Sequence, residues 1–301
     1  PWEIKNKFII LFNVFRKGFN YSQDGPGNRL VYHLQGCNMR CAWCSNPEGM
    51  ARKGTLLVDA DGLRESACPH GAITGNVIDR ERCASCLTRE CLTVNRNQSI
   101  RWSATPCDVE TLVAEAKRSM PLYFDGGGVT LSGGEVTVQF VATKRLLQRL
   151  KEEGIHTTIE TNGAHRRLAE LFPLVDCLII DFKHHDDARL RAATGVGSEL
   201  IKRSVRKALV EHPEVLIRIP LIGGFNDSAT DAEHFAAFFR PLDTGRARFE
   251  FLRYHEFGKD KWAQCGLPYR MERMKSAFVD DATVAQFHSI FAAAGLHIIH
   301  T

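Results

Sequence analysis

The stretch Gly36-Cys37-Asn38-Met39-Arg40-Cys41-Ala42-Trp43-Cys44 places three cysteines close together, directly after the apolar run 30–34. Three residues separate the first two cysteines, and two residues separate the last two. Three thiolates on one tight loop can hold three irons of a [4Fe–4S] cube, because cysteine thiolates are the usual ligands of such clusters. The fourth iron then lacks a protein ligand and is open to a substrate. The spacing therefore predicts a catalytic iron–sulfur site at the end of a strand.

A structural zinc site is the alternative interpretation of these cysteines. Such a site takes four ligands, usually from two Cys-x2-Cys pairs. Cys41 and Cys44 form one such pair, and Cys83 with Cys86 would form the other. This alternative leaves three of the seven cysteines between positions 37 and 91 without a role. A disulfide framework is typical of a short secreted chain, which this sequence does not resemble.

Downstream of position 107, short apolar runs alternate with stretches of helical spacing. The expected strands are 129–132, 157–160, 176–182, 215–219, 248–252 and 296–299. The expected helices are 109–119, 138–152, 164–171, 186–193, 198–211, 230–240 and 281–294. Alternating strands and helices indicate βαβ units and a parallel sheet. With 30–34 as the first strand, the sequence predicts an α/β protein, a partial (β/α)6 TIM-like barrel.

Polar motifs follow five of these strands at their carboxyl ends. In α/β barrels the active site lies at that end, on the loops that leave the strands. We therefore expect the five motifs to converge on one rim. They are 37–44, Gly133-Gly134-Glu135, 160–163, 181–183 and Tyr254-His255.

The 301 residues carry 39 Lys and Arg against 35 Asp and Glu, a net charge of +4, and 44% are hydrophobic. This composition excludes a disordered or fibrous chain, and the small positive surplus argues against a nucleic-acid partner. The apolar run 8–15 is far shorter than the ~20 residues that span a bilayer, and no small-residue cleavage site follows it. We expect a buried strand there, no membrane partner and a cytoplasmic protein.

The first cysteine loop, with the aromatic Trp43 before its last cysteine, resembles the radical S-adenosylmethionine (SAM) enzymes. The stretches 22–29 and 36–48 resemble more narrowly the glycyl-radical-enzyme activating enzymes, typified by the pyruvate formate-lyase activating enzyme. Further family blocks match in order, so that the resemblance covers nearly the whole chain. They are 130–135, 160–163, 181–183 and 254–259.

The resemblance implies the radical SAM fold and a role for each matched residue. Cys37, Cys41 and Cys44 would ligate the catalytic [4Fe–4S] cluster, and SAM would chelate its open iron. Asp24 would join them as a catalytic residue, because it lies in the segment that contacts the substrate glycine loop. The residues around SAM would be Trp43, Gly133, Gly134, Glu135, Glu160, Thr161, Asp181, Lys183, Arg218 and His255.

Some of these roles are more specific. Glu135 would hold the ammonium group of SAM, and Lys183 would meet its carboxylate. Arg218 and His255 match positions near the methionine and the ribose. The resemblance also implies a monovalent cation beside SAM, bound by Asp181 and by the residue at position 160. The family usually has Asp there, and this chain has Glu160, one methylene longer.

Each of these motifs taken alone also has a structural interpretation. Gly133-Gly134-Glu135 is a common turn after a strand, and 160–163 is a turn with a helix cap. Asp181 and Lys183 could form an ion pair at the end of a strand. His255 could be a hydrogen-bonded histidine under a loop. Their ordered combination with the cysteines favours the functional interpretation.

Residues 55–104 hold a second cysteine group. In bacterial ferredoxins the fourth cysteine of each run, followed by proline, ligates the cluster of the other run. Cys68-Pro69 resembles the end of a first run, and 76–86 resembles the approach to a second. We therefore expect a ferredoxin-like insertion with one auxiliary [4Fe–4S] cluster, although many activases with such an insertion carry two. Its ligands would be Cys68, Cys83, Cys86 and Cys91, and a zinc ion on the same four is the alternative.

Three other cysteines and one basic stretch either have alternative interpretations or are expected to be structural. Cys107 is either a cluster ligand or an ordinary thiol before Asp108, the expected cap of helix 109–119. Cys177 is expected to be a core thiol, and Cys265 to lie in a loop without a ligand role. The basic stretch 202–207 is either the solvated face of a helix or a docking face for an electron donor such as flavodoxin.

The resemblance implies an oxidoreductase that reductively cleaves SAM and takes hydrogen from a backbone glycine of a partner glycyl radical enzyme. A flavodoxin or ferredoxin-type protein would supply the electron. We expect a monomer, with the barrel formed by 1–54 and 105–301. The alternatives are a radical SAM enzyme that acts on a small molecule and a non-catalytic zinc-binding module. Segment 24–29 favours the activase.

Overall fold

The computed structural model describes residues 11–64, 68–94, 97–274 and 276–300. One eight-stranded sheet forms its centre, in the order β12-β11-β10-β9-β8-β2-β1-β7. Six neighbouring strands run parallel, and β1 and β7 extend the sheet antiparallel on one side. The parallel strands are β2 Asn28–Leu34, β8 Gly128–Gly133, β9 Thr157–Thr161, β10 Cys177–Asp181, β11 Val215–Leu221 and β12 Ala247–Arg253.

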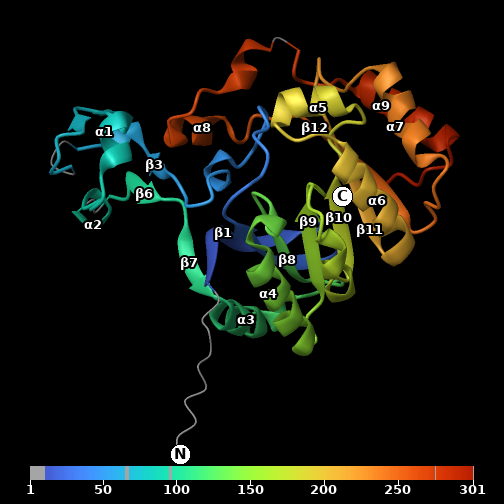
Figure 1. The fold of residues 1–301 in the computed structure, drawn as a ribbon, viewed down its shortest axis with the longest axis horizontal. Helices are drawn as coiled ribbons and strands as arrows, with labels where there is room; N and C mark the ends of the chain where they lie inside the picture. The colour runs from blue at the N-terminus through green and yellow to red at the C-terminus, as the bar shows by residue number, and fades with distance from the viewer. Residues whose placement is uncertain (1–10, 65–67, 95–96, 275, 301) are drawn as a thin grey trace, which may run out of the picture.

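The sheet is open, because β12 and β7 (Thr105–Asp108) stand at its opposite edges. The six parallel strands and the helices between them confirm the predicted partial (β/α)6 barrel (Figure 1). The long helices are α3 Val109–Arg118, α4 Phe140–Glu152, α5 Asp187–Thr194, α6 Glu199–Glu211, α7 Ala229–Phe239 and α9 Asp281–Ala293.

Local signals explain where these helices begin. Asp108 accepts a hydrogen bond from the backbone N–H of Thr111 and caps α3, as the sequence predicts. Ser228 and Asp231 form a reciprocal capping box at the start of α7, which satisfies two backbone donors. Apolar faces of these helices cover the sheet, and β10 is buried over Cys177–Ile180, so Cys177 is a core thiol as expected.

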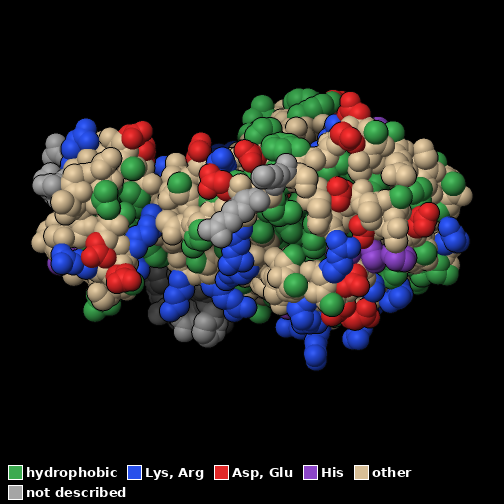
Figure 2. All heavy atoms as spheres, turned by 90° about the horizontal axis from the view of Figure 1, so that it is seen from above, with side chains coloured by type: hydrophobic (Ala, Val, Ile, Leu, Met, Phe, Trp, Pro, Cys, Tyr) green, Lys and Arg blue, Asp and Glu red, His purple; other side chains and the backbone are tan. Residues whose placement is uncertain are grey.

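The insertion, residues 55–104, forms a lobe beside the barrel (Figures 1 and 2). Its ends pair as the antiparallel strands β3 (Leu56–Val58) and β6 (Ile100–Trp102). Between them lie the hairpin strands β4 (Ile73–Thr74) and β5 (Val77–Ile78) and two short helices. The helices are α1 Arg80–Ser85 and α2 Cys91–Val94. The lobe has its own apolar cluster of Val58, Leu63, Ile73 and Ile100.

Three expectations need correction. The predicted helix 164–171 is wrong, because the chain forms the 3-10 helix η6 (Leu168–Leu174), which contains Pro173. The predicted strand 296–299 is wrong, because the chain makes only a bridge between Phe249 and Ile298. The predicted loop around Cys265 is wrong, because it ends helix α8 (Lys259–Cys265) and is buried.

The expected strand 8–15 lies partly outside the described residues. From Leu11 the chain does form a strand, but β1 continues to Tyr21 and pairs with both β2 and β7. Within the described residues no helix combines the length and the apolar character needed to cross a bilayer. No disulfide bond joins any of the ten cysteines, all of which lie in the described residues.

Candidate functional site

A cavity of about 250 Å³ opens at the carboxyl ends of the parallel strands. The loops that follow these strands line it, as expected for an α/β barrel. The five polar motifs that the sequence places on one rim do meet there. The lining includes Cys37, Cys41, Trp43, Cys44, Gly133, Gly134, Glu135, Glu160, Thr161, Asp181, Lys183 and His255.

The three cysteines of this cavity come from a loop, residues 36–50, that folds back on the strand before it; we call it the cysteine loop. Gly36 turns the chain with a φ of 98°, and its N–H donates to the Gly49 carbonyl at 2.7 Å. Cys41 is buried, and Cys37 and Cys44 are half-buried. The loop therefore presents three thiols to one cavity, as the spacing predicts.

The electrostatics of these thiols fit an iron–sulfur cluster. Burial raises the pKa of Cys37 to about 12 and also raises the pKa of Cys41 and Cys44. A charge on Cys41 opposes charge on the other two sulfurs, whereas Lys183 favours it. Buried thiolates need compensating positive charge, and a coordinated metal supplies it because a ligating thiol is deprotonated.

The turn after β8 lies directly against the cysteine loop. A Cβ on Gly134 would overlap the Gly36 carbonyl oxygen and approach that of Gly49 to 2.7 Å, so a larger residue does not fit. The N–H of Glu135 donates to the same Gly36 carbonyl at 2.9 Å. The backbones of the two loops therefore touch without intervening side chains.

The carboxylate of Glu135 is buried and joins the loops after β8 and β9. It accepts hydrogen bonds from the hydroxyls of Thr137 (2.6 Å) and Thr161 (2.7 Å) and from the backbone N–H of Asn162 (2.8 Å). This latch is a role that the sequence did not predict. Contact between Glu135 and the ammonium of SAM stays a prediction.

Lys183 and Asp181 form an ion pair in the cavity wall, with 2.6 Å between Nζ and Oδ2. Burial alone would lower the pKa of Lys183, but the charges of Asp181 and Cys41 outweigh it and raise that pKa. The structural interpretation of this motif, a strand-end ion pair, is therefore present. It also places a permanent cation beside the cysteine thiols.

Glu160 shares its two oxygens between Ser132 and Arg218. The Ser132 hydroxyl donates at 2.6 Å, and the Arg218 Nη1 donates at 2.9 Å. Arg218 also donates from Nε to Glu250 at 2.7 Å, and both residues are buried. Burial raises the pKa of Glu160 against the lowering effect of Arg218. Position 160 therefore belongs to a compensated internal network.

Two aromatic contacts fix the remaining predicted side chains of the cavity. The Trp43 ring packs 4.7 Å from the ring of Phe225. His255 stacks on Phe257 with 4.3 Å between ring centroids, and its Nδ1 accepts the backbone N–H of Phe257 at 3.3 Å. His255 is exposed, so the structural interpretation that it lies under a loop is wrong; it belongs to the cavity lining.

Asp24 and Arg218 are predicted site residues that lie outside this lining. Asp24 is in the turn between β1 and β2, where its carbonyl accepts the hydroxyl of Thr130 at 2.7 Å. Arg218 donates to the carbonyl of the adjacent Gln23. The turn therefore contacts Arg218, a member of the network around Glu160.

Sequence reasoning missed α8 and its contacts with the cysteine loop. The indole N–H of Trp262 donates to the Cys44 carbonyl at 2.9 Å. Lys261 donates to the Ser45 carbonyl at 3.1 Å and to the Asn46 side chain at 2.7 Å. A tryptophan and a lysine beside each other, shortly after the matched block 254–259, were the available signal.

The second cysteine group lines another cavity, of about 210 Å³, within the insertion. Burial raises the pKa of Cys83, and charges on Cys68, Cys91 and Cys86 raise it further. All four cysteines line this one cavity. The structure thus brings together the four cysteines that the sequence grouped. Cys107 lies elsewhere, in β7 opposite Phe12 of β1.

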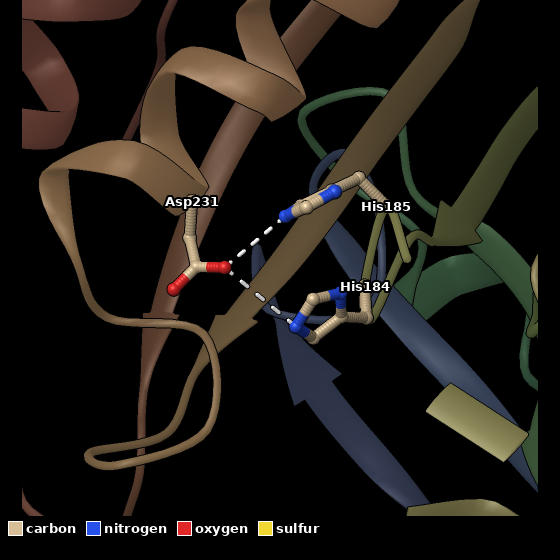
Figure 3. A group of neighbouring side chains, drawn as sticks. All are labelled: His184, His185 and Asp231. Carbon is tan, nitrogen blue, oxygen red and sulfur yellow. Dashed lines mark hydrogen bonds and ion pairs between the residues drawn. The ribbon is translucent and has the colours of Figure 1, made fainter. Parts of the chain in front are cut away.

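His184, His185 and Asp231 form a further group of metal-ligating side chains, with ligand atoms within 4.8 Å of one another (Figure 3). Nε2 of His185 lies 3.1 Å from Asp231 Oδ1, and Nε2 of His184 lies 3.7 Å from it. Burial lowers the pKa of His184 to about 4, so its ring is neutral. Its Nδ1 accepts the N–H of Asp186 at 2.9 Å, which leaves the proton on Nε2.

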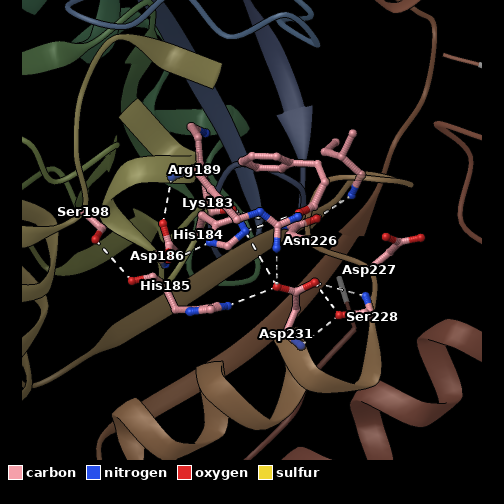
Figure 4. Close-up of polar contacts among 12 residues, drawn as sticks. Lys183, His184, His185, Asp186, Arg189, Ser198, Asn226, Asp227, Ser228 and Asp231 are labelled. Atoms are coloured by element: carbon pink, nitrogen blue, oxygen red, sulfur yellow. Dashed lines mark hydrogen bonds and ion pairs between the residues drawn. The ribbon is translucent and has the colours of Figure 1, made fainter. Parts of the chain in front are cut away.

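That proton occupies the nitrogen that a metal would need. Arg189 also donates to the same Asp231 oxygen at 3.1 Å, and its positive charge opposes a metal cation there (Figure 4). Asp231 meanwhile caps α7 through Ser228. We therefore interpret the group as a hydrogen-bonded contact that holds the loop after β10 against the start of α7.

Comparisons with known proteins agree with this geometry. The model of the radical SAM superfamily matches residues 31–236. The chain is 34% identical over 286 residues to the (2S)-3-sulfopropanediol sulfolyase activating enzyme of Bilophila wadsworthia, covering 89% of this chain and 92% of the relative. It is 29% identical over 290 residues to the 4-hydroxyphenylacetate decarboxylase activating enzyme of Clostridioides difficile, covering 91% and 90%.

A solved radical SAM methyltransferase from Sphaerobacter thermophilus shares the fold, with a TM-score of 0.54 at 15% identity. The alignment covers 97% of this chain and 76% of the methyltransferase. The family model spans more than half of the chain, and the activating enzymes match almost end to end. The chain therefore belongs to the radical SAM superfamily and, within it, to the activating enzymes of glycyl radical enzymes.

Proposed function

We propose that this chain is an activase that cleaves SAM and takes a hydrogen atom from a backbone glycine of a partner glycyl radical enzyme. The observation that carries the proposal is the meeting of three cysteine thiols with Lys183 in one cavity at the strand ends. The chemistry that a [4Fe–4S] cluster supplies to bound SAM there is one-electron cleavage to methionine and a 5′-deoxyadenosyl radical. The names of the activating-enzyme relatives support this reaction.

The chain's own residues bind, orient and shield. Cys37, Cys41 and Cys44 would hold three irons of the cluster, and Lys183 would meet the carboxylate of SAM. Exclusion of water from the occupied cavity would protect a reactive radical, and a fixed pose would bring the reacting carbon close to the glycine. Asp24 contacts the glycine loop of the partner. The remaining SAM-binding residues are Trp43, Gly133, Gly134, Glu135, Glu160, Thr161, Asp181, Arg218 and His255.

The proposal includes one auxiliary [4Fe–4S] cluster in the insertion (55–104), with the barrel formed by 1–54 and 105–301. One observation supports it: the four cysteines line one cavity. Four cysteine thiolates are the usual ligand set of a [4Fe–4S] cluster. The ligands are Cys68, Cys83, Cys86 and Cys91, and zinc is the alternative.

The monovalent cation that the family resemblance implies beside Glu160 and Asp181 stays a prediction. Arg218 and Lys183 already supply positive charge to these two carboxylates, at 2.9 and 2.6 Å.

The partners follow from the same reaction. An acidic flavodoxin or ferredoxin-type donor would supply the electron, and a basic surface between η6 and α6 suits it. There Arg166, Arg203 and Lys207 line a cavity of about 110 Å³. We propose that the protein is cytoplasmic, because a reducing compartment keeps the ten cysteines available as thiols. We also propose that it is a monomer.

Electron paramagnetic resonance (EPR) tests the function. The anaerobic protein is mixed with reductant, SAM and candidate partner enzymes, and a doublet from a backbone carbon radical identifies the partner. Cys41→Ala should abolish SAM cleavage, because the cube loses an anchor. Formation of 5′-deoxyadenosine by that variant would refute the assignment of the catalytic cluster.

Iron content tests the insertion. The wild-type protein should be brown and hold about eight irons per chain, as two [4Fe–4S] clusters require. Cys83→Ala should lower the iron content by roughly half and leave some SAM cleavage. An unchanged iron count, or a colourless protein that holds only zinc, would contradict the auxiliary cluster.

A further inference from the structure

Helix α8 (Lys259–Cys265) contacts both cysteine sites, although it contributes no ligand to either. On one side it holds the cysteine loop through Trp262 and Lys261. Lys261 also pairs with the buried Glu48 of the same loop at 3.2 Å. Gly258, which precedes the helix, approaches Ser45 so closely that a Cβ there would lie 2.7 Å from the Ser45 backbone.

On its other side, α8 contacts the insertion. Arg80, at the start of α1, donates to the Gln264 carbonyl at 2.7 Å and to the Leu56 carbonyl of β3 at 3.0 Å. Arg101 of β6 donates to the Gln264 side chain at 3.1 Å. The guanidinium of Arg80 packs against Gly266, where any side chain would overlap it. Figure 1 shows α8 between the lobe and the barrel.

The length of α8 makes these contacts decisive. Isolated helices shorter than about 12–15 residues are marginal in water, and α8 has 7 residues. Its helical state therefore depends on packing at both sides. Loss of the contacts on one side weakens the helix and, with it, the contacts on the other.

We infer that α8 is a positioning element that couples the geometry of the cysteine loop to the folded state of the insertion. Arg80 is the anchor in the insertion, and Trp262 and Lys261 are the anchors at the loop. Disorder in the insertion then loosens the backbone that carries Cys44. The catalytic meaning of this coupling rests on the proposed function, but the coupling itself is a property of the chain.

Hydrogen exchange measured by mass spectrometry tests the coupling in the reconstituted protein. Arg80→Ala should accelerate exchange in peptides covering 41–46 at least fivefold. Arg82→Ala is the matched control, because Arg82 lies on the same helix but donates to Gly71 and pairs with Asp79 inside the insertion. Equal exchange at 41–46 in the two variants would overturn the inference.

A substitution in α8, read out in the insertion, excludes simple unfolding of the insertion as the explanation. Coupling free energies are reciprocal, so Trp262→Phe, which removes the indole donor but keeps a ring, should accelerate exchange at 56–58 in β3. The two substitutions should also be non-additive at 41–46 in the double variant, because they act through one helix. An effect of Trp262→Phe confined to the cysteine loop would contradict the coupling.

EPR of the reduced catalytic cluster adds a second readout. Arg80→Ala should broaden the signal that SAM binding shifts, whereas Arg82→Ala should leave its shape as in the wild type. Hydrogen exchange needs neither SAM nor a partner enzyme, so the two claims can fail separately. An inactive protein with the predicted exchange pattern would contradict the proposed function but support the coupling. An active protein with identical exchange in all variants would support the proposed function but contradict the coupling.

Discussion

Replacement of Arg218 by methionine tests the buried charge network beneath the cavity. Arg218 is 3% exposed and lies 2.9 Å from Glu160 and 2.7 Å from Glu250. Methionine removes the positive charge from between two buried carboxylates. Removal of one partner from a buried ion pair costs about 3–5 kcal/mol. We therefore expect the free energy of unfolding to fall by about 3–5 kcal/mol at pH 8.

The loss in the free energy of unfolding should depend on pH. Burial already raises the pKa of Glu160 above 4.5, and without Arg218 it rises further. A carboxyl with a raised pKa binds its proton more tightly in the folded state than in the unfolded state. The penalty is therefore full at pH 8 and shrinks as the pH falls toward 4.5. Urea unfolding at pH 8, 6.5 and 5, followed by circular dichroism, measures it.

Arg248→Met is the matched control on the neighbouring strand. Arg248 pairs with Glu214, and both side chains are more than a third exposed. Exposed pairs contribute about 0–1 kcal/mol, so the control should lose at most about 1 kcal/mol. If Arg218→Met loses no more than this control at pH 8, or if its loss does not vary with pH, the reasoning is wrong.

Three other predictions address the cavity wall. Gly134→Ala should lower the free energy of unfolding by about 1–3 kcal/mol and reduce iron retention, because the new Cβ overlaps the Gly36 carbonyl. Urea unfolding measures the first effect and iron analysis the second. Unchanged values would contradict the close approach of the two loops. Glu135→Gln should lower the free energy of unfolding by about 1–3 kcal/mol and raise the KM for SAM, because it weakens a buried acceptor of four hydrogen bonds. A stability within about 0.5 kcal/mol of the wild type, on the order of a surface substitution, would exclude the latch. In the iron-free protein at pH 8, Cys37 should be alkylated more slowly than Cys86. Burial raises the pKa of Cys37 to about 12, whereas the backbone N–H of Arg89 lowers the pKa of Cys86. Peptide mass spectrometry gives both alkylation rates, and equal rates would contradict this prediction.

The parallel strands of the fold were predictable because their signals are local. An apolar run such as 176–182 between polar turns indicates a buried strand wherever it packs. The helix expected at 164–171 is wrong, because the chain forms the 3-10 helix Leu168–Leu174 instead. Pro173 within it has no backbone N–H, so the segment could not continue as a regular α-helix. The full extent of β1 was hidden, because Arg16, Lys17 and Asn20 give it the composition of an exposed segment.

In the candidate site, too, local features were predictable from the sequence and long-range contacts were not. Cys37, Cys41 and Cys44 were predictable, because ligand spacing on one loop is a property of consecutive residues. The pairing of Arg218 with Glu160 and Glu250 joins three different strands and exists only in the folded sheet. The contact of Trp262 with Cys44 spans 218 residues of sequence, which no local pattern reports.

The pairing of β3 with β6 has a consequence for how such chains diversify. Leu56 lies opposite Trp102, so the polypeptide leaves the barrel and returns to it at adjacent points. A module attached in this manner can be exchanged, shortened or replaced by a brief linker while the barrel strands keep their order. Helix α8 is different, because part of its packing comes from the insertion. A homologue without the insertion would need other contacts to stabilise α8.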